Sequence, residues 1–139
     1  MKTLRTKTMF KTVAILLAAV GLGVLIASLV MAHPRLKVVD PTSPKPGELL
    51  KAPPSEVRLA FLLGGNETGL DPNQSFFWVI KEDSLSVIAL GKVDQSAPGR
   101  DIMVAKLPKL EAGVYLVKWV AISTPDSGFA EGSYSFAVK

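Results

Sequence analysis

The chain contains no cysteine and a single histidine, His33, among its 139 residues. The lack of cysteine excludes a disulfide framework and any metal site built on thiolates. With one histidine, the sequence offers no Ser-His-Asp set. We also find no phosphate-binding loop and no paired carboxylates on a recognisable scaffold. These absences favour a binding protein over an enzyme.

Most of the chain carries no excess of positive charge. The sequence holds 16 Lys and Arg against 12 Asp and Glu, for a net charge of +4. Four of the basic residues, Lys2, Arg5, Lys7 and Lys11, precede a long apolar run, so basic and acidic residues balance from His33 onward. A nucleic-acid-binding surface needs clustered basic charge, and we therefore expect no nucleic-acid partner.

The apolar run covers residues 12–32 and contains no charge. Basic residues before such a run hold that end in the cytoplasm, so the rest of the chain lies outside. Val30-Met31-Ala32 suits a signal peptidase and predicts cleavage before His33, whereas the length of the run also suits an uncleaved anchor, since about 18 apolar residues span a bilayer. We expect residues 1–32 to be a signal peptide or membrane anchor and residues 33–139 to be one domain. That domain is secreted or anchored by residues 12–32, in the periplasm or on the extracellular face of the membrane.

After the leader, short apolar runs alternate with polar turns, and no run predicts a helix. The clearest pair is 113–122 and 132–139, on either side of a nine-residue polar turn from Ser123 to Glu131. The other candidate strands are 36–40, 56–63, 76–81, 85–90 and 102–107. This spacing predicts an all-β fold, a small antiparallel sandwich of seven strands. Tyr115, near the start of a long strand, is either a tyrosine corner or an ordinary core aromatic residue.

His33 has unusual chemistry if the leader is cut after Ala32. It would then carry both a free α-amine and an imidazole, and the two nitrogens can chelate one metal ion. Together with a carboxylate, such nitrogens suit Cu(II), and Asp126 in the polar turn is the candidate carboxylate. The competing interpretations are a polar residue at a chain terminus for His33, and a turn residue that bonds its own backbone for Asp126.

Several motifs occur together in a recognisable order. They are Ala112-Gly113-Val114-Tyr115 through Trp119, then Asp126, then Gly132-Ser133-Tyr134-Ser135-Phe136, with Val57-Arg58-Leu59-Ala60-Phe61 in the middle and His33, Leu36 and Pro41 at the start. This order resembles the CopC family of bacterial copper-resistance proteins. The resemblance implies a seven-stranded antiparallel Greek-key β-sandwich of the immunoglobulin-like type, after an N-terminal apolar helix. It also implies copper binding outside the cytoplasm.

The resemblance also implies a set of metal ligands. The family binds Cu(II) through an N-terminal histidine and through the Asp and His of a D-G-H motif, and these fall on His33, Asp126 and Gly128. Gly128 has no side chain, which implies a weakened site unless Glu131, water or a partner chain supplies a ligand.

Two functions follow from this resemblance. The first is an extracytoplasmic Cu(II)-binding protein for copper resistance or homeostasis, with copper as its ligand and a membrane copper transporter of the CopD type as the implied partner. The alternative is a membrane-anchored CopC-like structural or interaction module that no longer binds metal.

Overall fold

Nine β-strands make up the part of the chain that the computed structural model describes, residues 33–139. They are β1 (Arg35–Leu36), β2 (Leu49–Leu50), β3 (Glu56–Leu62), β4 (Gly69–Leu70), β5 (Phe76–Lys81), β6 (Ser86–Val93), β7 (Ile102–Lys106), β8 (Gly113–Thr124) and β9 (Phe129–Val138). Within these residues no helix is long and apolar enough to cross a membrane. The leader helix expected in residues 1–32 lies outside the described residues.

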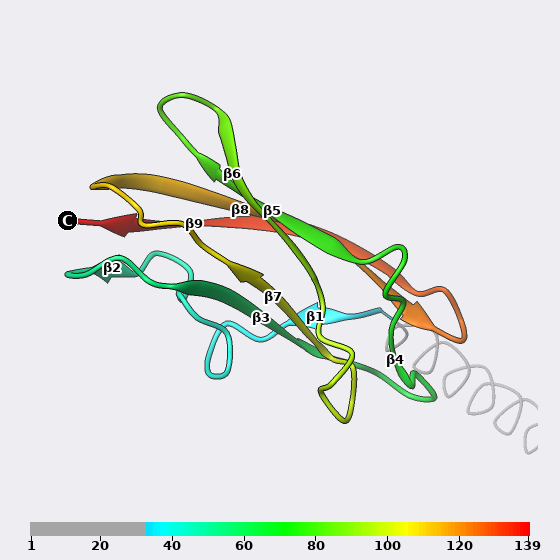
Figure 1. Cartoon of the computed structure of the whole chain (residues 1–139). Coiled ribbons are helices and arrows are strands. Elements are labelled where there is room, and N and C mark those ends of the chain that lie inside the picture. The colour runs from blue at the N-terminus through cyan, green and yellow to red at the C-terminus, as the bar shows by residue number, and fades with distance from the viewer. Residues whose placement is uncertain (1–32) are drawn as a thin grey trace, which may run out of the picture. The chain divides into compact units, whose positions relative to one another are not determined.

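The strands follow one hydrogen-bonded path, in the order β1-β3-β7-β6-β5-β8-β9-β2, and β4 pairs with β8 beside it. The path curls, so that β3 and β7 lie beneath β5, β8 and β9 (Figure 1). Rings of Phe61 on β3 and Trp119 on β8 meet edge to face at 5.2 Å across the core. The all-β prediction is confirmed. The structure has nine strands where the sequence predicted seven, and the β2–β9 pair is parallel.

The β8–β9 hairpin supplies one wall of the core. Inward-facing residues of both strands are buried: Tyr115, Val117, Trp119 and Ala121 on β8, and Tyr134, Phe136 and Val138 on β9. The two strands pair from Gly113 with Val138 to Ile122 with Phe129, and this register matches the predicted alternation. The turn is shorter than the nine residues expected, because Thr124 and Phe129 still belong to the strands.

Two buried tyrosines tie loops to the sheet. The hydroxyl of Tyr115 donates to the carbonyl oxygen of Glu111 at 2.9 Å, four residues upstream, which is the hydrogen bond of a tyrosine corner. The hydroxyl of Tyr134 donates to the carbonyl oxygen of Pro44 at 2.9 Å, inside the protein. Burial raises the pKa of Tyr134 above its usual value, so the phenol remains a donor even at alkaline pH where an exposed tyrosine would ionise.

These two hydrogen bonds differ in what a tyrosine-to-phenylalanine change would leave behind. Tyr134→Phe leaves the buried carbonyl of Pro44 without a hydrogen-bond donor and should lower the unfolding free energy by about 2 kcal/mol. Tyr115→Phe should cost about 1 kcal/mol, because Glu111 is exposed and water can take over its carbonyl. Urea unfolding of the two variants measures the difference. Equal losses would contradict this account of the two loops.

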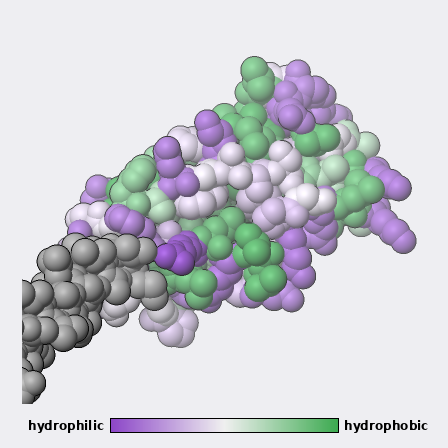
Figure 2. Space-filling model, turned by 180° about the vertical axis from the view of Figure 1, so that it is seen from behind, coloured by the Kyte–Doolittle hydropathy of each residue, from purple (hydrophilic) through white to green (hydrophobic). Residues whose placement is uncertain are grey.

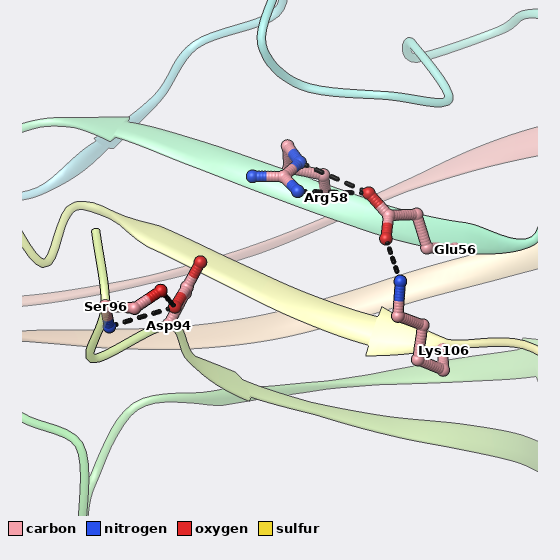
Figure 3. Close-up of polar contacts among 5 residues, drawn as sticks. All are labelled: Glu56, Arg58, Asp94, Ser96 and Lys106. Carbon is pink, nitrogen blue, oxygen red and sulfur yellow. Dashed lines mark hydrogen bonds and ion pairs between the residues drawn. The ribbon is translucent and has the colours of Figure 1, made fainter.

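A small network of charges lies on the solvent-facing side of β3 and β7 (Figure 3). The Glu56 carboxylate accepts from Lys106 Nζ at 2.6 Å and from Arg58 Nη2 at 3.1 Å. These hydrogen bonds, that of Lys106 first, lower the pKa of Glu56 below its usual 4.5. In the neighbouring loop, Asp94 Oδ1 accepts from the Ser96 amide at 3.0 Å and from the Ser96 hydroxyl at 2.6 Å.

Glu56→Gln should make the protein less stable by about 0.5 kcal/mol at pH 7, the scale of a solvent-screened ion pair. The folded-state pKa of Glu56 is depressed, so its contribution is complete above pH 4.5 and disappears as the pH falls through the folded-state value. Urea unfolding at pH 7 and at pH 3 should therefore show a larger difference from the unmodified protein at pH 7 than at pH 3. A difference of the same size at both pH values would exclude the charge as its cause.

Candidate metal centre

Asp126 sits in the four-residue turn between β8 and β9. Its Oδ1 accepts hydrogen bonds from the Ser123 hydroxyl at 3.0 Å and from the Gly128 amide at 3.2 Å. The Ser123 amide in turn donates to the Gly128 carbonyl at 2.9 Å, which closes the turn. The second oxygen, Oδ2, has no partner among residues 33–139, and the side chain is exposed. Asp126 therefore stabilises the turn through Oδ1, while Oδ2 is free to bind a ligand.

His33 is exposed and lies two residues before the first residue of β1. The next residue, Pro34, is fully buried and anchors the start of the domain. β1 pairs antiparallel with the end of β3, with Arg35 opposite Leu62. Continuing that register by two residues brings His33 toward Gly64, at the start of the loop that follows β3.

The loop after β3 connects the start of the domain with the β8–β9 turn. Its Thr68 amide donates to the carbonyl of Thr124 at 2.7 Å, and β4 then pairs with Ser123 and Thr124 at the end of β8. The start of β1, β4 and the β8–β9 turn accordingly lie at the same end of the domain, opposite the C-terminus (Figure 1). The structure thus places both predicted ligands, His33 and Asp126, at this end.

The same loop contributes a carboxylate that the sequence did not single out. Glu67 Oε2 accepts from the amide of Gly64, while Glu67 Oε1 is buried and has no hydrogen-bond partner within the described residues. A buried carboxylate oxygen without a donor is costly in a protein interior and is expected to bind water or a cation. The sequence signal was only a glutamate in a glycine-bounded loop, and its position depends on the pairing of β4 with β8.

The two remaining candidate positions offer no side chain to this site. Glu131, expected as a substitute ligand, lies on β9 opposite Val120 and faces outward from the sheet. Gly128 is buried within the turn. Among residues 33–139, no group of three or more His, Asp or Glu side chains is close enough to form a metal site by itself.

Comparison with known proteins now identifies the fold. A model of the CopC domain matches residues 39–139, most of the chain. The chain belongs to the CopC domain family. The matched region includes Asp126 and Glu67 but begins after His33.

Solved structures agree with this assignment to the CopC family. CopC from Methylosinus trichosporium OB3b is 28% identical and superimposes with a TM-score of 0.63, over 77% of this chain and 94% of that one. PcoC, a methionine-rich copper resistance protein from Escherichia coli, is 27% identical with a TM-score of 0.58, over 78% of this chain and all of that one. No curated protein matches the chain. In this CopC domain, the only methionine among residues 33–139 is Met103, which is fully buried in the core.

Proposed function

We propose that this CopC-domain protein binds Cu(II) outside the cytoplasm, as a copper-resistance or homeostasis protein without catalytic activity. In this proposal the leader is removed after Ala32, and the α-amine and imidazole of His33 supply nitrogen ligands. Asp126 supplies an oxygen ligand through Oδ2. The copper is cargo, which the protein buffers or passes on to a membrane transporter.

What supports this proposal is that three suitable groups lie at one end of the domain, where they do not form a metal site by themselves among residues 33–139. Nitrogen from His33 and carboxylate oxygen from Asp126 and Glu67 match the mixed nitrogen and oxygen sets that Cu(II) prefers. Glu67 Oε1 is the group that most needs a partner, because it is buried and unbonded. It also provides a further ligand where the family histidine is replaced by Gly128.

The proposal is tested on the protein exported by cells that express the full chain. Mass spectrometry of that protein should give an N-terminus at His33, and Cu(II) titration should give one ion bound per chain. Electron paramagnetic resonance of the loaded protein should show a tetragonal site with nitrogen coupling. A protein that begins at Met1 has no free amine on His33, and its presence as the only product would exclude this ligand set.

The alternative is a CopC-like interaction module that has lost its metal, and Gly128 is the observation in its favour. This alternative predicts that the exported protein binds no Cu(II) above the level of a variant lacking His33, Glu67 and Asp126 side chains. The same titration therefore decides between the two functions.

A further inference from the structure

The outer face of the sheet is unusually apolar over β6, β5 and β8. Strand alternation turns Phe76, Trp78 and Ile80 of β5, Leu90 of β6, and Leu116 and Val120 of β8 away from the core. Leu90 is 52% exposed, and the others are half-buried. An antiparallel sheet with one face in water normally carries polar residues there, and a contiguous apolar face of this kind marks an interaction site.

Figure 2 shows groups of apolar residues among polar ones on the surface. Apolar side chains are also exposed outside the outer face, among them Val38, Val39 and Leu62. The outer face differs because its apolar residues lie in register on three adjacent strands. Trp78 pairs with Leu90 on one side and Lys118 on the other, and Phe76 pairs with Val120. The face is therefore a continuous surface at the centre of the sheet.

Trp78 stands between two hollows on this face. One, of ≈ 370 Å³, is lined by Phe76, Leu90 and Lys92 among others. The other, of ≈ 450 Å³, is lined by Lys118, Val120 and Glu131 among others. An edge-to-face contact with Phe76, at a centroid distance of 4.8 Å, supports the indole ring. A ridge with a hollow beside it fits an identical surface turned by a two-fold rotation, because each ridge then enters the other's hollow.

Two opposite charges on the face have the same self-complementary arrangement, and a further exposed lysine, Lys92, lies opposite Phe76. Lys118 on β8 and Glu131 on β9 are both exposed on this face. They belong to two neighbouring rows of paired residues across the strands: Lys118 is opposite Ser133, and Glu131 is opposite Val120. Neither of them forms an ion pair with another residue of the described part of the chain. A two-fold axis in the plane of the contact, which bisects the diagonal from Lys118 to Glu131, would bring Lys118 of each copy to Glu131 of the other, twice per dimer.

We propose that this outer face is the contact surface between two copies of the chain, with Trp78 at its centre and two reciprocal pairs of Lys118 with Glu131. An anionic membrane would attract Lys92 and Lys118 but repel the exposed Glu131, whereas a second copy of the chain pairs Glu131 with a lysine. The proposal does not depend on copper binding, because neither His33 nor Asp126 takes part in it.

Single cysteines provide the first test, since the chain has no cysteine of its own. In the full chain expressed in cells, Ser133→Cys should give a disulfide-linked dimer under mild oxidation, because Ser133 lies in the same row as Trp78 and Lys118. The matched control is Gln95→Cys, which is exposed on the loop after β6. Equal cross-linking of both variants, or none of Ser133→Cys, would overturn the proposal.

Reversal of the two charges provides the second test. Lys118→Glu and Glu131→Lys should each weaken self-association of the full chain at least about tenfold in sedimentation experiments, because each reversal makes two contacts repulsive. An equimolar mixture of the two variants should associate like the unmodified protein, because both reciprocal contacts are attractive in the mixed pair. A monomeric unmodified chain, or a mixture that associates no better than either variant alone, would exclude this interface.

Discussion

His33→Ala should weaken Cu(II) binding by about a hundredfold or more, the largest effect expected of any single change at the proposed site. Even partners outside the ligand set change metal affinity by about 10- to 100-fold, so loss of an imidazole ligand should cost at least as much. The α-amine survives this substitution in a processed chain, so a residual weak site is expected rather than complete loss. Competition titration with a Cu(II) chelator of known affinity measures the change.

Carboxylate variants separate a true site from general attraction of a cation. Glu67→Gln and Asp126→Asn should each lower Cu(II) affinity. Glu82→Gln should not, because Glu82 is exposed in the turn after β5 and its amide bonds the carbonyl of Val114 at the start of β8. Urea unfolding of the metal-free variants checks that each remains folded. Unchanged affinity in His33→Ala would show that copper binds elsewhere and would overturn the ligand set.

Gly91→Ala should lower the unfolding free energy by about 3 kcal/mol, the largest stability effect expected of adding a single methyl group. Gly91 on β6 is paired with Phe77 on β5, and the phenyl ring lies directly over the glycine. A Cβ atom at position 91 would lie 2.0 Å from Phe77 Cε1, and Phe77 itself is fully buried. The ring cannot move away without displacing its neighbours in a close-packed core, so the strain remains in the folded state.

A double variant tests whether this contact is the cause. Phe77→Leu removes the ring edge that the new methyl group would meet. Combined with Gly91→Ala, it should cost at least about 1 kcal/mol less than the sum of the two single changes, as for residues in direct contact. Urea unfolding of the four proteins completes the cycle. Additive losses would mean that Gly91 is required for another reason, such as the local backbone conformation of β6.

The longer strands could be predicted because each has one face in the core. Tyr115, Val117 and Trp119 recur at every second position of β8, and that period is visible in the sequence alone. The two-residue strands β2 and β4 were missed because two residues cannot show a period. β1 is also shorter than the predicted 36–40, since Val38 and Val39 are exposed and form no sheet pairs.

The candidate site was only partly accessible to sequence reasoning. His33 and Asp126 stood out through their chemistry and through the order of family motifs. Their location at one end of the domain depends on pairings between distant segments, β1 with β3 and β4 with β8. Glu67 gave no comparable signal, because its buried and unbonded oxygen arises only when those pairings form. Copper binding by these residues stays a prediction.

The two ends of the domain differ in how well they tolerate an attached tag or label. β9 ends at Val138, on the side away from the β8–β9 turn (Figure 1). An affinity tag, a fluorophore or a surface linker attached after Lys139 would therefore leave the proposed copper end open for measurement. Any peptide fused ahead of His33 would convert its amine into an amide, so recombinant products that retain such an extension would report a false negative in metal assays.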